Sequence, residues 1–486
     1  MSDDINGLKR QTISGLFWKF SERIAAQLVS FVVSIVLARV LMPKEYGVVA
    51  IVTIFISLAD ILVTNGLGVT LIQKKDADDL DFNTIFYSGI VLSVIIYVLL
   101  FSGAPIVAKI YKMENITPIL RVMGLRIPIA AVNTVQQAYV SRRMDFKKFF
   151  FSTFFGTMVS GVVGILMAYN GTGAWALVGQ YLTNTVIDTL VLFFTVGWRP
   201  KRVFSLERFK ILFSFGFKIM ITGFIGAFFN QLKGLIIGIR YDSEDLAYYN
   251  RGEKFPTLIT SNIESSIDSV LFPVLSKHQD DNRVLVAAMR KFIRMASFVI
   301  MPMMVGLAVT GDKVIEILLT DKWSMCVPYL RIICVQQIFS ILNTANLQIV
   351  KAKGQGNTLV KMEFIKKPIM LAIIFISMQW GPIAIACGVT LYELIGSCIN
   401  SIPTKRLVGY SITMQLADIS RNLFVSVIMG IVVFFVGRIS GNSILILGLQ
   451  VIMGAVSYVM LSFLIKNTCL FDLKELIGNY VGSRKR

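Results

Sequence analysis

The sequence predicts an all-α membrane protein with about 14 transmembrane helices, arranged as two pseudo-symmetric six-helix lobes around a central cavity plus two C-terminal helices. Three observations support this prediction: the composition, the number of long apolar segments and an internal repeat. The chain of 486 residues is 55% hydrophobic and 16% charged, with a mean hydropathy of +0.70. Because soluble proteins carry about 25% charged residues, this composition excludes a water-soluble globular protein.

Fourteen segments are long and apolar enough to cross a membrane, which takes about 20 residues of helix. The fourth, eighth and tenth are the most polar. They are included because the basic loops alternate between the two sides of the membrane only if all fourteen are counted. The predicted spans are residues 14–41, 46–69, 83–108, 117–140, 150–169, 173–196, 211–239, 256–275, 290–310, 328–350, 361–380, 382–402, 419–437 and 443–465.

The basic residues predict the orientation of the chain. The 48 Lys and Arg outnumber the 29 Asp and Glu, which gives a net charge of +19. With the N-terminus in the cytoplasm, thirty basic residues lie on the cytoplasmic side and nine on the outer side, the bias of the positive-inside rule. We therefore expect both termini in the cytoplasm and no nucleic-acid partner. The first apolar segment is too long for a cleavable signal peptide, and Lys19, Glu22 and Arg23 interrupt it.

Residues of the first six spans recur in the same order in the next six. Because six is an even number, the two copies share one orientation in the membrane, as in parallel-repeat transporters that work by alternating access. The predicted domains are residues 1–205 (N-lobe), 206–410 (C-lobe) and 411–486 (the last two spans and a cytoplasmic tail). The matching residues are Gly15 and Arg39 with Gly216 and Arg240; Thr53, Ser57, Asp60 and Thr64 with Thr257, Ser261, Glu264 and Asp268; and Pro118, Leu120, Arg121, Asn133 and Thr134 with Pro328, Leu330, Arg331, Asn343 and Thr344.

Basic residues inside spans are candidates for substrate binding. Such charges are costly in a bilayer and usually face a bundle interior or a water-filled cavity. Lys19 and Arg23 share a face of the first span, and Lys218 and Lys233 lie in the seventh. The alternative is that the lysines extend to the headgroups, and that Arg23 pairs with Glu22 or Asp60. Contact with the headgroups is also expected for the arginines near span ends, Arg121, Arg126, Arg294 and Arg331. A cationic cavity would suit an anionic, hydroxyl-rich ligand, since Arg binds phosphate through two hydrogen bonds.

A polar stripe on the second and eighth spans is the second candidate. The spacing of four, three and four residues places the side chains of each set on one helix face. The carboxylates could bind a proton or a sodium ion and couple transport to its gradient, or they could only neutralise the cavity cations. The stripe residues are Thr53, Ser57 and Asp60 on the second span and Thr257, Ser261, Glu264 and Asp268 on the eighth.

The sequence contains no recognised catalytic or metal-binding motif. One His and five scattered Cys give no metal-ligand spacing. A phosphate-binding P-loop is also absent from the sequence, so we expect no bound cofactor and no ATP-driven transport within this chain. We predict a transporter rather than an enzyme.

One segment near the N-terminus resembles the N-terminal signature of Wzx-type polysaccharide flippases. It reads Leu37-Ala38-Arg39-Val40-Leu41-x-Pro43-x-x-Tyr46-Gly47. These belong to the multidrug/oligosaccharidyl-lipid/polysaccharide exporter superfamily, and the pattern is most similar to the branch of colanic-acid and teichuronic-acid exporters. The resemblance covers roughly residues 10–410. It continues through Leu71-Ile72-Gln73-Lys74, Arg143-Met144-Asp145-Phe146-Lys147, Gly173-x-Trp175-Ala176-Leu177-Val178, Tyr248-Tyr249-x-Arg251 and Phe272-Pro273-x-Leu275-Ser276.

The resemblance implies a function in surface polysaccharide biosynthesis. The cargo would be a short glycan on undecaprenyl pyrophosphate, moved from the inner to the outer leaflet of the bacterial inner membrane. Membrane lipids and the polysaccharide polymerase machinery would be the partners. The family implies two six-helix lobes in a V around a cationic cavity.

Two other functions are compatible with parts of the sequence. A multidrug/cation antiporter of the same superfamily would use Asp60 and Glu264 as a cation site, but the basic residues inside the spans disfavour it. A membrane enzyme acting on lipid-linked glycans would need acidic residues or an Arg/His cluster at the outer surface. The longest expected outer loop, residues 311–327, carries only Asp312, Glu316 and Asp321 as acids.

Overall fold

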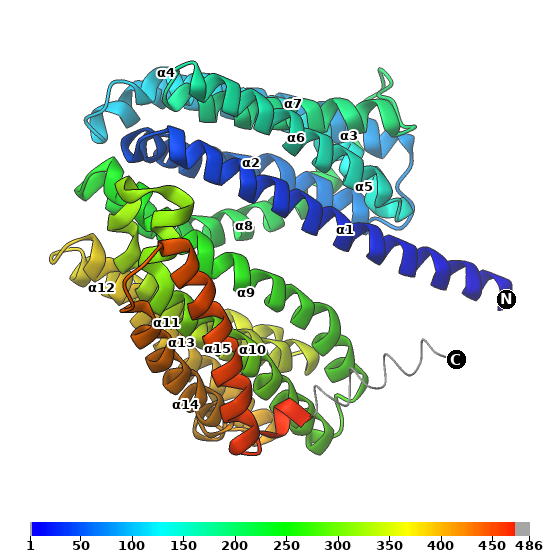
Figure 1. Ribbon diagram of the computed structural model, residues 1–486. Helices are drawn as coiled ribbons and strands as arrows, with labels where there is room; N and C mark the ends of the chain where they lie inside the picture. Colours follow the sequence, from blue (N-terminus) through cyan, green and yellow to red (C-terminus); the bar gives the residue numbers. More distant parts are fainter. Residues whose placement is uncertain (1, 472–486) are drawn as a thin grey trace. The chain divides into compact units, whose positions relative to one another are not determined.

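The computed structural model describes the backbone of residues 2–471, and the side chains of this range except 2–17, 19, 20, 23, 65 and 265–270. The described chain is a succession of helices, which confirms the predicted all-α membrane fold (Figure 1). The elements are α1 Ser2–Val40, α2 Pro43–Gln73, α3 Asp79–Ile110, α4 Ile116–Met123, α5 Arg126–Arg143, α6 Lys147–Tyr169, α7 Ala174–Thr195, α8 Leu206–Arg240, α9 Ser243–Lys277, α10 Asn282–Leu319, the 3₁₀ helix η1 Asp321–Cys326, α11 Val327–Ala352, α12 Gly356–Ser377, α13 Pro382–Val408, α14 Ile412–Gly437 and α15 Ser443–Leu464.

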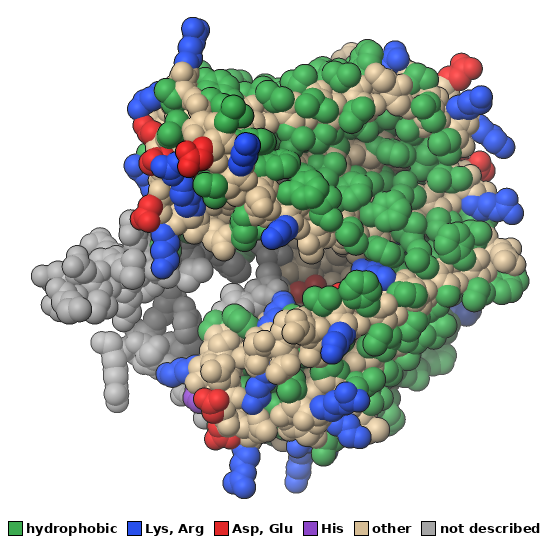
Figure 2. Space-filling model, turned by 180° about the vertical axis from the view of Figure 1, so that it is seen from behind, with side chains coloured by type: hydrophobic (Ala, Val, Ile, Leu, Met, Phe, Trp, Pro, Cys, Tyr) green, Lys and Arg blue, Asp and Glu red, His purple; other side chains and the backbone are tan. Residues whose placement is uncertain are grey.

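Each predicted span corresponds to a helix. Eleven helical segments of the described chain are long and apolar enough to cross a membrane, with α4 and α5 counted as one and η1 and α11 as another, and Ile24–Val40 of α1 is a shorter apolar helix. The helices α9 and α12 fall outside this set because polar and charged residues interrupt their apolar runs. In the upper part of Figure 2, hydrophobic side chains form a broad band with charged side chains toward both ends, as expected for a surface in a bilayer.

The chain divides into two compact units, Met1–Ala247 and Tyr248–Arg486. Unit 1 therefore includes α8, which the sequence analysis assigned to the start of the second lobe. The cause is close packing between α2 and α8. A Cβ atom on Gly216 of α8 would lie 2.9 Å from the carbonyl oxygen of Gly66 of α2, so only glycine allows this approach.

Equivalent residues of the two repeats make equivalent contacts, each within its own unit. The guanidinium of Arg121 donates from Nε to the carbonyl of Phe101 on α3, at 3.2 Å. Arg331 donates from Nε to the carbonyl of Ala308 on α10, at 3.1 Å, and also pairs with Asp312. These contacts support the internal repeat at the level of side chains.

The prediction of an outer loop at residues 311–327 is wrong. The helix α10 continues to Leu319, and η1 and α11 follow after Thr320. Thr320 lies between α10 and η1 and has a positive φ of 78°, where the chain changes direction. The acids that the sequence placed in a loop lie on helix ends, where Asp312 pairs with Arg331.

Two of the signature segments, Leu71–Lys74 and the one that begins at Gly173, contact neighbouring helices. Arg142 donates to the carbonyls of Leu71 and Lys75, at 2.7 and 2.9 Å, and also to Lys74, so its guanidinium satisfies the C-terminal end of α2. Gly173 has a φ of 58°, and a Cβ atom there would lie 2.4 Å from Oε1 of Glu45. These contacts join helices within unit 1.

Candidate functional site

The polar stripe of α2 lies against α8 within unit 1. Thr53 donates to the carbonyl of Val49 at 2.7 Å, and Ser57 to that of Ile54 at 2.8 Å. Ser57 also accepts a hydrogen bond of 3.2 Å from the amide of Gln231 on α8. The hydroxyls are therefore satisfied inside the protein, and Ser57 links the stripe to α8.

Asp60 is the chemically distinctive member of this stripe. It is half-buried, and within the described part of the chain its Oδ1 is a buried oxygen with no hydrogen-bond partner. Arg126 of α5 lies near enough to act electrostatically on the carboxyl group. A buried carboxyl oxygen without a donor is costly, and it leaves one position for a proton or a cation.

Arg126 is a residue that the sequence analysis placed differently. We expected headgroup contact, whereas its Nε donates to the hydroxyl of Thr185 on α7 at 3.0 Å, and its guanidinium carbon lies 5.6 Å from the ring centre of Tyr181. The fourth span breaks between α4 and α5 at Gly124 and Leu125, and Arg126 begins the second piece. Gly124, two residues before Arg126, was the available signal in the sequence.

Asp188 of α7 is a functional candidate that sequence reasoning missed. Its Oδ2 accepts a 2.6 Å hydrogen bond from the amide of Asn133 on α5, and its Oδ1 accepts from the hydroxyl of Ser152 on α6. On the neighbouring face of α6, Thr153 donates to Glu22 of α1 at 2.9 Å. The signal in the sequence was an acidic residue within an apolar segment. Asp188 lies outside the two polar stripes of the second and eighth spans, on which the sequence comparison of the repeats depended.

Unit 2 contains the second stripe, on α9. Thr257 is exposed and accepts a 3.1 Å hydrogen bond from the amide of Gln337 on α11. Ser261 donates to the carbonyl of Leu258 at 3.5 Å, and Glu264 is half-buried and has an interaction partner. The side chain of Asp268 lies outside the described residues.

The four candidate cations have different positions. Lys218 is exposed on α8, and Lys233 is half-buried on the same helix with an interaction partner. Fifteen residues separate the two, which is about 22 Å along the helix axis, so they cannot bind one phosphate together. The side chains of Lys19 and Arg23 lie outside the described part of the structure.

Long apolar helices with polar and ionisable groups inside them are the organisation of a membrane transporter. Solved structures have the same fold. A structure described as "Lipid II flippase MurJ, inward closed conformation" matches with a TM-score of 0.75 and 14% identity, over 93% of this chain and 98% of that one. An inward-facing multidrug resistance MATE family transporter of the MOP superfamily matches with a TM-score of 0.60 and 13% identity, over 79% and 94%.

Residues 36–328 match the family model described as "Polysaccharide biosynthesis protein". The chain belongs to this family of Wzx-type polysaccharide flippases, which confirms the resemblance seen in the sequence.

Three curated relatives are each 23% identical to this chain. The teichuronic acid biosynthesis protein TuaB of Bacillus subtilis aligns over 93% of this chain and 95% of its own length. The succinoglycan biosynthesis transport protein ExoT of Rhizobium meliloti aligns over 94% of each. The lipopolysaccharide biosynthesis protein WzxC of Escherichia coli aligns over 81% and 80%.

Proposed function

We propose that this protein moves an oligosaccharide linked to undecaprenyl pyrophosphate from the inner to the outer leaflet of the bacterial inner membrane, for surface polysaccharide biosynthesis. The observation that carries the proposal is similarity along almost the whole chain to proteins named for teichuronic acid biosynthesis and succinoglycan transport. Movement would occur by alternating access, which the parallel repeat suits. Both termini would lie in the cytoplasm, as the distribution of basic residues predicts.

The basic residues of the spans would hold the anionic head group. We propose that Lys19 and Arg23 on α1 and Lys218 and Lys233 on α8 contact the pyrophosphate and the sugars. Because α8 separates its two lysines by about 22 Å, each would contact a different part of an extended head group, or the same phosphate at different stages of transport. The guanidinium of Arg23 would bind phosphate through two hydrogen bonds.

Asp60 would couple transport to a proton or sodium gradient. Its buried Oδ1 has no donor among the described residues, and Arg126 provides a positive charge nearby. Binding of a proton or a sodium ion to Asp60 would weaken its attraction to Arg126. Thr257, Ser261, Glu264 and Asp268 would extend the polar path in unit 2.

A multidrug/cation antiporter is the second candidate, because the fold is shared with a MATE family transporter and Asp60 offers a carboxylate. Arg126 beside Asp60 repels a cationic drug, so the lipid-linked glycan is the better substrate.

The polysaccharide polymerase machinery would receive the lipid-linked glycan after its transport to the outer leaflet.

Depletion of the protein in a cell that makes the polysaccharide tests the proposal. We expect the lipid-linked glycan to accumulate on the cytoplasmic leaflet, where a glycosidase added to intact spheroplasts cannot reach it. If the depleted cells keep a normal glycan pool on the outer leaflet but become sensitive to cationic dyes, the antiporter is the better account.

A further inference from the structure

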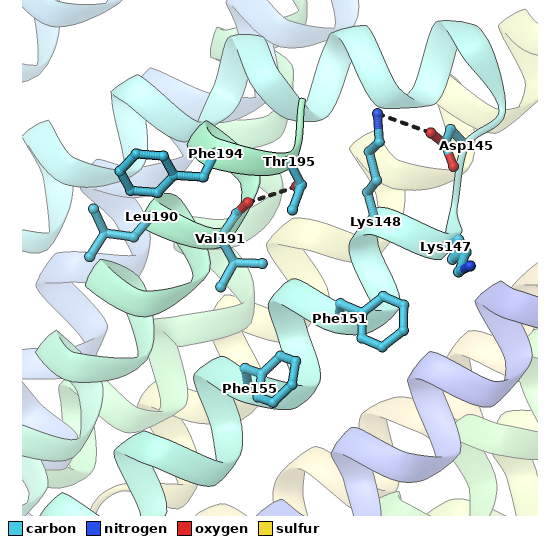
Figure 3. Close-up of a pocket in the computed structure, with 9 residues that line it drawn as sticks. All are labelled: Asp145, Lys147, Lys148, Phe151, Phe155, Leu190, Val191, Phe194 and Thr195. Carbon is cyan, nitrogen blue, oxygen red and sulfur yellow. Dashed lines mark hydrogen bonds and ion pairs between the residues drawn. The ribbon is translucent and has the colours of Figure 1, made fainter. Parts of the chain in front are cut away.

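A groove between α6 and α7 of unit 1 has a volume of about 640 Å³ (Figure 3). Lys147, Lys148, Phe151 and Phe155 of α6 and Leu190 and Phe194 of α7 line most of it. Its size is in the range of about 300–1,000 Å³ that is typical of sites for small ligands. No part of the proposed transport path uses it.

Beyond the two lysines, the groove is lined mainly by apolar side chains. Phe151 and Phe155 lie one turn apart on α6, and Leu190 and Phe194 lie one turn apart on α7, so each pair presents one face. The end of α7 lies at the start of α6 because the two helices are antiparallel neighbours, as Figure 3 shows. Phe155 is 46% exposed and Phe194 is 73% exposed, which leaves room for a hydrocarbon chain against the rings.

One end of the groove is cationic. Lys147 and Lys148 begin α6, and the Nζ of Lys148 lies 3.1 Å from Oδ2 of Asp145. The Nζ of Lys147 lies 5.5 Å from the ring centre of Trp18 and 5.9 Å from that of Phe151. Two ammonium groups and one carboxylate give this end a net charge of +1.

The start of α6 adds to this attraction for anions. No side chain caps the N-terminus of this 23-residue helix, and the helix dipole places partial positive charge there. A lipid whose phosphate lies at the lysines can therefore place its hydrocarbon chain in the apolar part of the groove. Basic residues at the cytoplasmic end of membrane helices favour anionic lipids for the same reason.

We propose that this groove is a binding site for an anionic glycerophospholipid with a single phosphate, with the headgroup at Lys147 and Lys148 and one acyl chain between α6 and α7. The net charge favours this occupant over a lipid pyrophosphate, whose two or more negative charges would exceed the one positive charge present. This site does not depend on the transported substrate, and lipid binding is measured without any transport assay.

Native mass spectrometry of the delipidated full-length protein tests the site. Titration with dioleoyl phosphatidylglycerol is compared with dioleoyl phosphatidylcholine and with soluble glycerol phosphate. We expect the first phosphatidylglycerol to bind about fivefold more tightly than phosphatidylcholine, and glycerol phosphate not to compete because it lacks the chain.

Variants locate the site. Lys147→Ala with Lys148→Ala weakens phosphatidylglycerol binding to the level of phosphatidylcholine, while Asp145→Asn strengthens it because Lys148 loses its competing partner. Phe155→Trp fills the groove and weakens binding without changing the charge. Lys210→Ala, an exposed lysine of unit 1, is the matched control and leaves the affinity unchanged.

Three results would overturn the proposal: equal affinity for the two phospholipids, no effect of the double lysine variant, or preferential binding of undecaprenyl pyrophosphate that Lys147→Ala with Lys148→Ala abolishes. The last result would assign the groove to a lipid pyrophosphate. Asp145→Asn keeps both lysines and the whole apolar lining, so its gain of affinity remains measurable if the double variant does not fold.

Discussion

The amide of Asn133 donates a 2.6 Å hydrogen bond to the carboxylate of Asp188, joining α5 to α7 inside unit 1. Unit 2 contains the same relationship, because Asn343 of α11 donates a 2.6 Å hydrogen bond to Glu393 of α13. Asn133 and Asn343 are equivalent residues of the repeat. Each repeat therefore joins its fourth and sixth helical spans by an amide and a carboxylate, and the Asn133 amide is buried whereas the Asn343 amide is half-buried.

The first prediction concerns this link. Asn133→Ala removes a donor from a half-buried carboxylate, so we expect a loss of about 1–3 kcal/mol of stability, measured as thermal unfolding in detergent. Gln137→Ala, at an exposed position of the same helix, is the control and should be neutral. Equal unfolding temperatures for the two variants would mean that the amide has no stabilising role.

The second prediction concerns the close approach of α2 and α8. Gly216→Ala places a Cβ atom 2.9 Å from the backbone oxygen of Gly66 and 2.9 Å from Oγ1 of Thr70, so the helices must separate and stability falls. Gly226→Ala on the same helix meets no atom within 4 Å and should be neutral, or stabilising by up to about 1 kcal/mol from helix propensity. The reverse order of the two unfolding temperatures would contradict the packing.

The third prediction concerns pH. The hydrogen bond from the backbone N–H of Asp81 lowers the pKa of Asp78 below its ordinary value of 3.8, and the charges of Arg208 and Lys74 act in the same direction. Because the folded-state pKa is lowered, this stability is present above the unfolded value and is lost as the pH falls through the folded-state pKa.

Asp78→Asn separates this titration from the capping of α3. Asn remains a good N-cap, so the variant should lose less stability than wild type as the pH falls from about 5 to about 2. Asp78→Ala loses the cap as well, which costs about 1 kcal/mol at neutral pH. Identical acid profiles for wild type and Asp78→Asn would contradict this account.

The fourth prediction concerns the attachment of α14 to α10 in unit 2. The buried carboxylate of Asp418 accepts hydrogen bonds from Arg290 at 2.8 Å and from Arg294 and Tyr410 at 2.9 and 2.8 Å. Asp418→Ala should lower the unfolding temperature markedly, because it leaves two adjacent guanidinium groups without their shared acceptor. Arg421→Ala, exposed on the same helix, is the control. Equal protease resistance of the two variants would show that the cluster does not anchor α14.

The fifth prediction concerns coupling. If Asp60 carries the coupling ion, Asp60→Asn abolishes the dependence of transport on the gradient and leaves downhill equilibration of substrate between the leaflets. The measurement is transport in vesicles with and without an imposed proton or sodium gradient. A variant that still responds fully to both gradients excludes Asp60 as the coupling site.

Most of the fold could be predicted from the sequence because hydropathy is a local property. Even the polar helix α9, the eighth predicted span, could be predicted, since the alternation of basic loops required it. The packing of α8 with unit 1 could not be predicted, because it depends on a contact between Gly216 and Gly66 that lie far apart in the sequence.

The candidate site was less predictable for a physical reason. Span position alone does not show which way a side chain turns, so Arg126 was expected at the headgroups and instead contacts Thr185. Asp188 was missed because its partners Asn133 and Ser152 lie on two other helices. The roles of Lys19, Arg23, Lys218 and Lys233 stay predictions.

The most direct test of the central claim is reconstitution of the purified protein in liposomes with a fluorescent glycan on undecaprenyl pyrophosphate in one leaflet. We predict protein-dependent movement of the glycan to the other leaflet, impaired in Arg23→Ala protein that inserts normally and unchanged in Lys210→Ala protein. A glycan that stays in its leaflet, while the same vesicles transport a cationic dye, would contradict the account.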